Sequence, residues 1–405
     1  MSLNNLTMAV IFGSRSCEHD VSIISALQWM DAADKASYHV VPLYIARDGL
    51  WYTGDKLRQI EAFRTFDPQT EGIVRVQLDT SANAGDLWAW PPRHAGGLFG
   101  RKEPKPLCHI DVAVPVLHGL NGEDGTVQGM LELANIPYTS AGLLGSSVGM
   151  DKIAMKMLFR GAGFPVVDGD WFTRDLWHEK RAEILERLEA RLSYPLFVKP
   201  ANLGSSIGIT RATDRASLAE AIDVAASFDR RILVEAGVEH PLEVNCAALG
   251  YGADVQVSVC EMPISSGDML DFAKKYLANA SKSGGSKGMQ SLSRVIPAPV
   301  PADMTQRIQD LSRDIFRVLD CKGTVRIDFM IDAKTDALYV GEVNTIPGSL
   351  AFYLWDACGV HYPELVEKMV EYAFKAHADK NHNVVAYDST ILQGYVNGAK
   401  GAKKA

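Results

Sequence analysis

The sequence predicts an α/β fold with a mostly parallel sheet in its N-terminal part, followed by smaller α+β units. Two patterns support this prediction: strand-like and helix-like segments alternate from residue 7 onward, and two apolar strands near the C-terminus are joined by a short polar turn. With 405 residues, 47% hydrophobic and 22% charged, the chain is long enough for two or three domains with buried cores.

The N-terminal part is expected to alternate strands with helices. Residues 7–12, 38–45 and 110–117 are apolar runs that predict buried strands, and residues 21–33 predict a helix. Such alternation is typical of parallel strands with helices on the faces of the sheet. Over residues 79–106 the pattern lapses into Gly, Pro, Trp and charged residues, which predicts a long surface excursion.

A second, smaller domain is expected to begin at a junction over residues 138–145. A helix over 126–134 precedes this junction, and a helix over 151–160 follows it. The further elements of this domain are predicted to be helices at 178–192 and 214–226 and strands at 194–199, 207–211 and 231–235.

The third region is expected to combine strands, a polar stretch, a long helix and a hairpin. In chain order these are strands 243–249 and 254–260, the Gly/Ser/Lys-rich stretch 265–291, the helix 302–319, the hairpin strands 324–331 and 338–343, and the helix 363–375. We therefore expect domains at 1–140, 141–236 and 237–378, with a tail at 379–405 that frays.

The composition excludes several classes of protein. A formal net charge of −8, without a Lys/Arg block before the last few residues, argues against a nucleic-acid partner. Six scattered cysteines without a C-x-x-C pair are typical of a reduced compartment, so a cytoplasmic location is expected. No signal-peptide pattern and no apolar run near 18 residues occurs, which predicts a chain that is neither exported nor membrane-spanning.

The predicted hairpin carries the strongest chemical signal. Arg326 and Asp328 are two residues apart on one strand, and Glu342 and Asn344 are two apart on the next, so all four are expected on one sheet face. Two carboxylates and an amide suit Mg²⁺, with water and phosphate oxygens completing its shell. The alternative is a cross-strand ion pair on a solvent face. The strongly apolar neighbours of these residues favour the metal site.

A glycine loop follows the strand at 194–199. It reads Lys199-Pro-Ala-Asn-Leu-Gly-Ser205-Ser206, and such a loop offers backbone amides, hydroxyls and a lysine charge to a phosphate. It is not the G-x-x-x-x-G-K-[ST] P-loop, and by itself an ordinary turn explains it better. Its combination with the predicted magnesium site favours phosphate binding.

Three weaker motifs remain open. The loop from His118 to Gly125 follows the strand 110–117, where α/β folds place ligands, although a plain turn explains it equally well. In the loop after the first strand, Glu18 could receive a substrate ammonium group or cap a helix, and its single glycine argues against NAD. The pair Lys275-Tyr276 fits a lid that closes on ATP, or a solvated loop.

Taken in order, the motifs resemble the D-alanine:D-alanine ligase family over about residues 8–375. They are Glu18-His-Asp-Val-Ser22, His118-Gly-x-x-Gly-Glu-Asp-Gly125, Lys199-Pro-x-x-x-Gly-Ser-Ser206, Lys275-Tyr276, Arg326-Ile-Asp328 and Glu342-Val-Asn344-Thr-x-Pro-Gly348. The resemblance implies an ATP-grasp fold of three domains, the first Rossmann-like, with ATP between the last two and a dimer as the usual assembly.

The resemblance also implies roles at the substrate side of the site. Glu18 would hold the ammonium of the first D-amino acid, and Ser205 and Tyr276 would form with it a hydrogen-bonded latch on the lid. An oxyanion would be stabilised by Arg326 and the Gly348 N–H. The substrate-binding residues would be His118, Tyr353 and Leu354.

The same resemblance implies the cofactor and metal positions. Lys152, Lys199, Ser206 and Lys275 would contact ATP phosphates, and Glu235, Val238 and Glu243 would hold adenine and ribose. The spacing from Glu235 to Glu243 is one residue longer than the family pattern. Asp328, Glu342 and Asn344 would bind two Mg²⁺ ions, with Mn²⁺ as an alternative metal.

One departure bears on the second substrate. Tyr353 stands where the family typically has a serine that receives the carboxylate of that substrate, and a phenol is bulkier. A smaller departure is Ser14, which replaces a glycine. The leading hypothesis is an ATP- and Mg-dependent D-Ala:D-Ala ligase that forms an acyl phosphate and serves peptidoglycan synthesis in a bacterial cytoplasm. The alternatives are a sister ligase with another acceptor such as D-Ser, and a non-catalytic nucleotide or amino-acid sensor.

Overall fold

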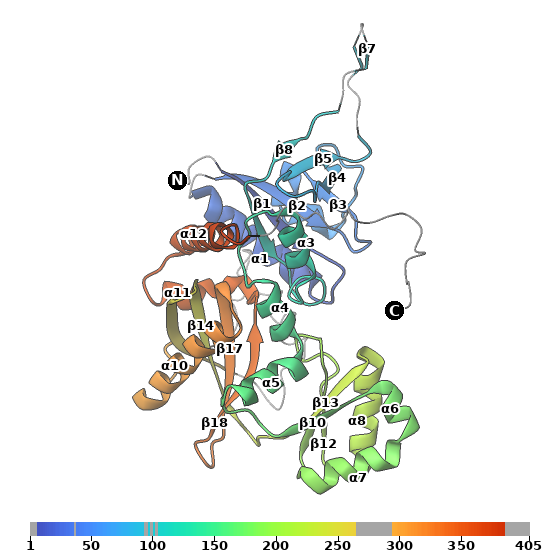
Figure 1. The fold of residues 1–405 in the computed structure, drawn as a ribbon, viewed down its shortest axis with the longest axis vertical. Coiled ribbons are helices and arrows are strands. Elements are labelled where there is room, and N and C mark those ends of the chain that lie inside the picture. Colours follow the sequence, from blue (N-terminus) through green and yellow to red (C-terminus); the bar gives the residue numbers. More distant parts are fainter. Residues whose placement is uncertain are drawn as a thin grey trace, which may run out of the picture.

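The computed structural model of the protein describes residues 6–35, 38–92, 96–97, 100–101, 104–264 and 294–384. Within these residues the chain forms three main sheets of seven, four and five strands, and a small two-stranded hairpin. Figure 1 shows the first sheet in one lobe, the five-stranded sheet below it, and the four-stranded sheet in a lobe beside the latter. The predicted combination of α/β and α+β units is confirmed.

The first sheet is mixed, so the expectation of a mostly parallel sheet was wrong. Its order is β8-β5-β4-β3-β2-β1-β9, and only β2, β1 and β9 are mutually parallel. The connections after β2 and β4 are too short for a parallel crossover, which needs a dozen or more residues, usually a helix. The longer connection after β3 also joins antiparallel neighbours. The strands are β1 Thr7–Gly13, β2 His39–Ile45, β3 Trp51–Thr53, β4 Val74–Leu78, β5 Asp86–Ala89, β8 Cys108–His109 and β9 Val112–Val116.

The segment 79–106 is only partly a surface excursion. Strand β5 within it pairs with β4 and β8, and Leu87 of β5 is fully buried against the same cluster as Val76 and Leu78. A four-residue strand between turns is too short to show a period of two, which explains why the sequence pattern missed it. The hairpin of β6 (Gly96–Gly97) and β7 (Gly100–Arg101) lies beyond it.

The middle sheet has its own core. Its order is β10-β13-β11-β12, with antiparallel neighbours throughout, and helices pack on it around the buried Trp177. The elements are β10 Gly169–Thr173, α6 Arg174–Glu179, α7 Arg181–Arg191, β11 Leu196–Pro200, β12 Thr210–Ala212, α8 Arg215–Phe228 and β13 Arg231–Ala236. Strand β10 was not anticipated from the sequence.

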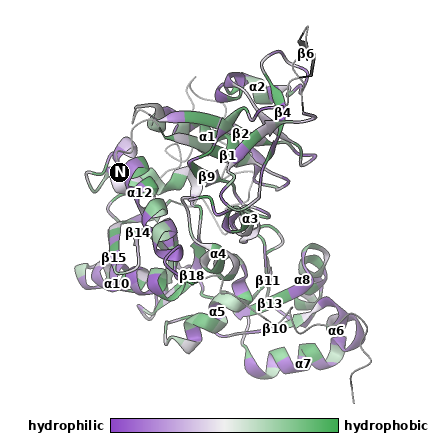
Figure 2. Ribbon diagram, turned by 45° about the horizontal axis from the view of Figure 1, so that its top comes forward, coloured by the Kyte–Doolittle hydropathy of each residue, from purple (hydrophilic) through white to green (hydrophobic). Residues whose placement is uncertain are grey.

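The single helix expected over 178–192 is two helices. The chain breaks at Lys180, with φ −133° and ψ 39°, between α6 and α7. This break lets Trp177 on α6 and Leu188 on α7 enter the same core from different directions. Helix α7 therefore shows alternating hydrophobic and hydrophilic stripes in Figure 2.

The third sheet is antiparallel and has the order β16-β15-β14-β17-β18. Its strands are β14 Leu242–Tyr251, β15 Asp254–Pro263, β16 Arg294–Val295, β17 Lys322–Ile331 and β18 Leu338–Asn344. Helix α10 (Ala302–Val318) covers one face, and Phe316 is buried there. The hairpin β17–β18 and helix α10 match the sequence prediction.

Two helices connect the first sheet to the others. Helix α4 (Leu143–Met150) begins inside the segment 138–145 that the sequence marked as a junction, and α5 (Lys152–Gly161) follows it. The Asp151 carboxylate caps α5 by accepting from Ile153 N and Ala154 N, which begins the helix where the sequence predicts one. Met155 and Phe159 of α5 belong to the apolar cluster of the third sheet.

The first and third sheets share a second apolar cluster. Helix α1 (His19–Lys35) covers the first sheet, and the last helix, α12 (Tyr362–Lys380), packs against both α1 and the third sheet. Trp29 of α1 and Met369 of α12 are fully buried in this cluster, which also contains Trp355 of α11 (Phe352–Asp356). These two sheets therefore form one packed body.

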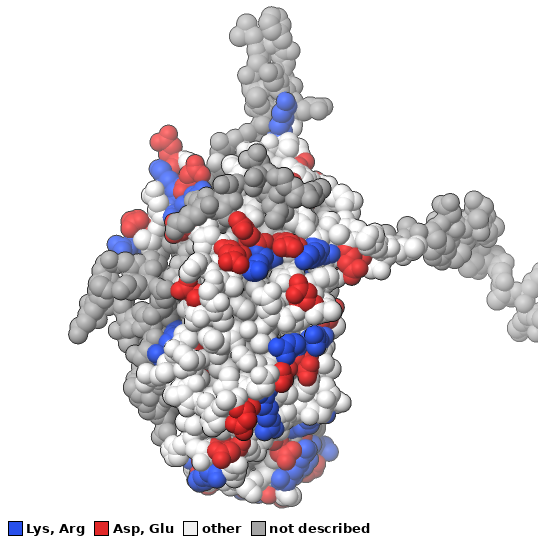
Figure 3. All heavy atoms as spheres, turned by 90° about the vertical axis from the view of Figure 1, so that its left-hand side faces the viewer, with Lys and Arg blue, Asp and Glu red and all other residues white. Residues whose placement is uncertain are grey.

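The surface charges are mixed in sign. On the face in Figure 3, Lys and Arg side chains alternate with Asp and Glu, and no extended basic patch is visible there. Among the described residues, no helix is both long and apolar enough to cross a membrane.

Gly13 at the end of β1 is expected to be intolerant of a side chain. Its φ is +94°, and a Cβ there would meet the Ile45 carbonyl oxygen, which accepts the Ser14 N–H, and the Tyr44 ring. We expect Gly13→Ala to lower the free energy of unfolding by about 1–3 kcal/mol, measured by chemical denaturation. Gly161→Ala is the control, because a Cβ there meets nothing within 4 Å. Equal stability of both variants would contradict the strain argument.

Candidate active site

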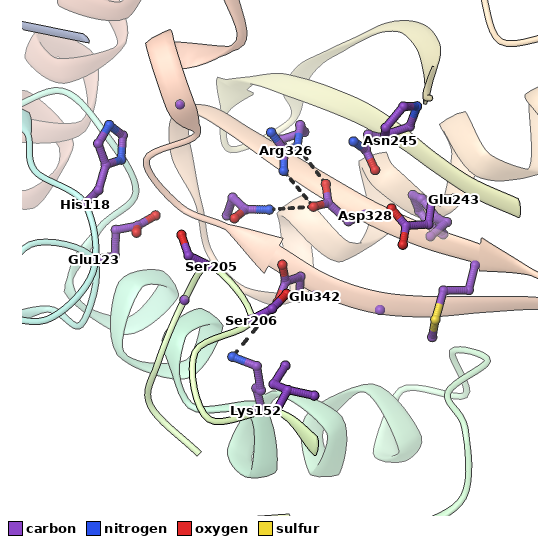
Figure 4. A pocket seen from close by; sticks show the side chains of 18 of the residues that line it. His118, Glu123, Lys152, Ser205, Ser206, Glu243, Asn245, Arg326, Asp328 and Glu342 are labelled. Atoms are coloured by element: carbon purple, nitrogen blue, oxygen red, sulfur yellow. Dashed lines mark hydrogen bonds and ion pairs between the residues drawn. The ribbon is translucent and has the colours of Figure 1, made fainter. Parts of the chain in front are cut away.

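One cavity of about 280 Å³ lies where the three sheets meet, and residues from all three form its wall. Figure 4 shows loop residues of the first sheet, the glycine loop, helix α5 and strands of the third sheet facing one another across it. The predicted site residues that line it are Glu18, His118, Lys152, Lys199, Ser205, Ser206, Glu243, Arg326, Asp328, Glu342, Asn344 and Gly348.

One face of the third sheet supplies a row of polar side chains. Glu261 on β15 is in register with Asn245 on β14, which is in register with Asp328 on β17. Asp328 is in turn opposite Glu342 on β18. Residues in register across neighbouring strands share a face, and the alternate residues such as Ile327 lie in the apolar cluster behind the sheet. Side chains that alternate between the two faces of each strand therefore produce both the polar row and the apolar core behind it.

Arg326 and Asp328 form a two-bond ion pair. Arg326 Nε donates to Asp328 Oδ1 and Nη2 donates to Oδ2, both at 2.7 Å, and Asn344 Nδ2 donates to Oδ2 at 3.0 Å. Burial raises the pKa of Asp328, Arg326 opposes this shift and the nearby Glu342 adds to it. A positive charge placed beside this carboxylate would stabilise its ionised form.

The donor set suits a magnesium ion that also binds phosphate oxygens. Asp328 and Glu342 offer two carboxylates on one face, with the Asn344 amide beside them. Mg²⁺ is usually held by one or two carboxylates together with substrate phosphates and water. Across the described ranges, no group of three or more His, Cys, Asp or Glu side chains could hold a metal by itself. The residues therefore fit a metal that arrives with a phosphate ligand.

Three lysines stand on the side of the cavity formed by α5 and β11. Lys152 Nζ donates to the Leu203 carbonyl at 2.5 Å and lies 3.9 Å from Glu342 Oε2. Lys199 Nζ is 2.7 Å from Glu235 Oε2, and Lys156 Nζ is 2.8 Å from Glu235 Oε1. These cations face the carboxylates of the third sheet and can receive a polyphosphate between them.

Glu235 is a buried carboxylate between two lysines. Its side chain is 1% exposed. Although burial alone would raise its pKa, Lys156 and Lys199 lower the pKa of Glu235 to about 2. Glu235 is not part of the cavity wall. Its ion pair holds Lys199 in position, and Lys199 lines the wall. Val238 lies outside the wall as well, after the end of β13.

Glu18 is held by the glycine loop. Ser205 Oγ donates to Glu18 Oε1, which joins two of the three residues of the predicted latch. A Cβ on Gly204 would lie 3.0 Å from Glu18 Oε2, and one on Gly119 would lie 2.8 Å from it, so both approaches require glycine. The third latch residue, Tyr276, and the predicted phosphate ligand Lys275 lie outside the described residues.

His118 is buried and neutral. Burial lowers the pKa of His118 to about 4, and the Arg326 charge acts in the same direction. Its Nε2 lies 3.1 Å from Ser25 Oγ, which also accepts the Ser349 N–H at 3.1 Å. The Ser25 hydroxyl thereby fixes both His118 and the turn after Gly348, whose residues adopt left-handed φ angles.

Glu123 was not singled out from the sequence, although it belongs to the quoted His118 motif. Its carboxylate accepts the Gly119 N–H at 2.9 Å and the Ile346 N–H at 3.1 Å, which joins a loop of the first sheet to the end of β18. Burial, followed by the charge of Glu18, raises the pKa of Glu123 above its usual range. Glu123 positions the loop that carries His118.

Tyr353 and Leu354 do not lie on the cavity wall. Leu354 is fully buried in the cluster between the first and third sheets. Tyr353 is 7% exposed, and its hydroxyl donates to Glu261 Oε1 at 3.0 Å. The structure thus places both residues behind the wall rather than at a substrate. Besides Glu123, the wall residues that the sequence reasoning missed are Lys156, Asn245, Glu261 and Arg294.

This architecture defines a ligase of the ATP-grasp class. The family described as D-ala D-ala ligase N-terminus matches residues 7–141, and the family described as D-ala D-ala ligase C-terminus matches residues 158–371. The chain belongs to the D-alanine–D-alanine ligase family.

Curated relatives and solved structures agree with this assignment. The D-alanine–D-alanine ligases of Thermosipho melanesiensis and Acetivibrio thermocellus are 35% and 37% identical to this chain. Their alignments cover 96% and 94% of it, and 98% of each relative. The D-alanine-D-alanine ligase from Coxiella burnetii is similar in structure, with a TM-score of 0.74 and 26% identity, over 94% of this chain and 97% of that one. The VanG D-Ala:D-Ser ligase from Enterococcus faecalis has a TM-score of 0.75 and 28% identity, over 91% and 100%.

Proposed function

We propose that this enzyme joins two D-alanine molecules to D-alanyl-D-alanine for peptidoglycan precursors, with ATP and Mg²⁺, through an acyl phosphate. The observation that carries the proposal is the single cavity that brings Glu18 and Ser205 opposite Arg326 and Asp328. An acidic residue, a hydroxyl and an arginine around a phosphate-binding wall match the needs of a zwitterionic substrate that is phosphorylated on its carboxylate.

In the first step, Glu18 receives the ammonium of the first D-alanine and Ser205 holds Glu18 in place. The substrate carboxylate then attacks the γ-phosphate of ATP, and Lys152 and Lys199 stabilise the phosphate charge. When bound at Asp328, Glu342 and Asn344, two Mg²⁺ ions offset the charge that spreads over the transferring group. Ser206 donates to the phosphates from the same loop.

In the second step, the amine of the second D-alanine attacks the carbonyl of the acyl phosphate, the bond from this carbon to the phosphate oxygen breaks, and inorganic phosphate leaves while the amine loses a proton. Arg326 and the Gly348 N–H stabilise the oxyanion. Because His118 is neutral at pH 7, it acts as a hydrogen-bonding residue toward the first substrate rather than as a cation. The nucleotide base and ribose lie near Glu235, Val238 and Glu243, with Glu235 acting mainly through Lys199. Lys275 and Tyr276 remain sequence-based proposals for closing the site.

The proposal extends to the organisation of the protein. We place the domains at 1–140, 141–236 and 237–378 with a tail at 379–405, a homodimer as the assembly, Mn²⁺ as a substitute metal, and the cytoplasm as the location. The cytoplasm is where a precursor enzyme meets ATP and free amino acids.

A D-Ala:D-Ser ligase is the second candidate. It is favoured by Tyr353 in the usual serine position and by the similarity to a D-Ala:D-Ser ligase. A changed acceptor pocket alters selectivity without altering the phosphoryl-transfer half of the site.

The first experiment measures ADP release from Mg-ATP with D-Ala as the only amino acid, with products identified by mass spectrometry. We expect ADP release that depends on D-Ala and yields one D-Ala-D-Ala per ADP. Product only when D-Ser is added would favour the second candidate. ADP release that is independent of every amino acid would contradict both ligase functions.

A further inference from the structure

The residue expected to receive the second substrate's carboxylate is engaged elsewhere. Tyr353 donates its hydroxyl to Glu261, and Asn245 Nδ2 donates to the same Glu261 oxygen at 3.1 Å. Tyr353 is 7% exposed and is absent from the cavity wall. A phenol whose proton is committed to a buried carboxylate is a poor donor to a substrate. Another residue must therefore supply the positive charge for the acceptor.

Arg294 at the start of β16 is in the position to do so. It lines the cavity together with Glu261, Arg326 and Gly348. Its Nη1 is 2.9 Å from Glu261 Oε2, and its guanidinium lies 3.8 Å from the centroid of the Tyr353 ring. Its side chain is only 11% exposed. An ion pair on one edge and an aromatic ring against one face fix the orientation of this guanidinium at the cavity wall.

We propose that Arg294 binds the carboxylate of the acceptor amino acid, and that Glu261 and Tyr353 are positioning residues that hold Arg294. This assignment rests on the proposed ligase function and deepens it by naming the acceptor class, a small amino acid with a free α-carboxylate. Arg326, whose Nε and Nη2 are engaged by Asp328, lines the same cavity.

This arrangement explains why the enzyme can have a tyrosine at position 353. In the family pattern a serine stands there, and its hydroxyl would contact the substrate directly. A serine is too short to stack on an arginine, whereas a phenol ring offers a face for the guanidinium and a hydroxyl for Glu261. Glu261 is 2% exposed, so its charge requires these partners. Tyr353 therefore acts by positioning Arg294, and Arg294 rather than Tyr353 selects acceptors that have a carboxylate.

The test compares D-Ala with D-alaninamide as the acceptor, because the amide lacks the carboxylate and cannot act as the donor. We expect the wild-type enzyme to prefer D-Ala strongly in kcat/KM. Arg294→Met should lower this preference about 10- to 100-fold through the acceptor KM, since one charge-assisted contact is lost. The KM values for ATP and for the donor D-Ala should stay unchanged. If the wild type uses a different acceptor, the comparison is made with that amino acid and its amide.

Two further variants separate binding from support. Tyr353→Phe keeps the ring beneath Arg294 and should change the preference less than about threefold. The double variant Arg294→Met/Glu261→Gln avoids leaving a buried carboxylate unpaired, and it should reproduce the loss if Arg294→Met alone folds poorly. Arg317→Met, on the half-exposed surface of α10, is the matched control and should behave as wild type.

The outcomes are distinct. An active enzyme in which Arg294→Met, or the double variant, keeps its preference for the carboxylate contradicts this assignment alone. If Tyr353→Phe loses as much preference for the carboxylate as Arg294→Met does, the Tyr353 hydroxyl rather than Arg294 binds the acceptor carboxylate. A wild-type enzyme that makes no dipeptide from any amino-acid pair contradicts the proposed function and the assignment with it.

Discussion

Asp328→Asn is expected to lower kcat about 10³-fold. In the proposed reaction, a metal bound at this carboxylate would contribute several kcal/mol of transition-state stabilisation, and each 1.36 kcal/mol corresponds to a factor of ten. The Asp328 side chain is 21% exposed, against 41% for Glu342 beside it, and Asp328 also holds Arg326 through two bonds of 2.7 Å. Asparagine keeps the volume but removes the negative charge, so both the metal and the arginine lose their partner. Turnover is measured as D-Ala-dependent ADP release.

Two measurements separate the metal role from damage to the fold. Mn²⁺ titration followed by electron paramagnetic resonance should show weaker metal binding in the presence of ATP, and thermal unfolding reports the cost of an unpaired Arg326. Asp332→Asn is the control on the same hairpin, because the Asp332 carboxylate accepts from the backbone N–H of Lys334 in its own turn and does not line the cavity. Turnover near wild type in Asp328→Asn would remove this residue from the metal site.

Glu235→Gln is expected to destabilise the fold by about 3–5 kcal/mol, because removing one partner of a buried ion pair leaves uncompensated charge. Lys156 and Lys199 lie within 2.8 Å of the Glu235 carboxylate, and Lys156 is 3% exposed. Burial lowers the pKa of Lys156, so this lysine depends on Glu235 to remain charged. The measurement is the free energy of unfolding in urea at pH 7, beside Glu239→Gln, whose exposed pair with Lys334 should contribute no measurable stability.

The pH dependence of this effect has a defined sign. The pKa of Glu235 is lowered to about 2 in the folded protein from 4.5 in the unfolded chain, so the folded state binds fewer protons between these values. Its contribution is therefore complete above pH 4.5 and decreases as the pH falls toward 2. The stability difference between wild type and Glu235→Gln should be constant from pH 7 to 5 and shrink below 4.5. A difference that grows on acidification would contradict this role.

The metal face was predictable because it depends on a local rule. The strands that carry Arg326, Asp328, Glu342 and Asn344 are joined by a short turn over residues 332–337. The alternation of side chains therefore places these four residues together without knowledge of the rest of the fold. The same rule placed the apolar residues between them in the core. The glycine loop was predictable for a similar reason, since Lys199 and Ser205 are close in the sequence.

The other wall residues depend on pairings that the sequence does not display. Asn245 and Glu261 reach the site only because β14 pairs with β17, which begins more than 70 residues later. The Tyr353 hydroxyl donates to Glu261. The presence of a tyrosine at position 353 does not reveal which distant carboxylate accepts this hydrogen bond. The family pattern therefore predicted the position of Tyr353 in the chain but not the direction in which its hydroxyl acts.

The connections of the middle sheet have a topological consequence. The chain enters through β10 and leaves through β13, and these strands are direct neighbours, with Ala236 N donating to Asp168 O at 2.8 Å. In Figure 1 this unit stands apart from the body formed by the first and third sheets, and its apolar cluster contains only its own residues. The unit is therefore inserted into the chain at two neighbouring points. Replacing it with a homologous unit requires changes at these two points only. Selection can therefore change this unit while the first and third sheets keep their packing.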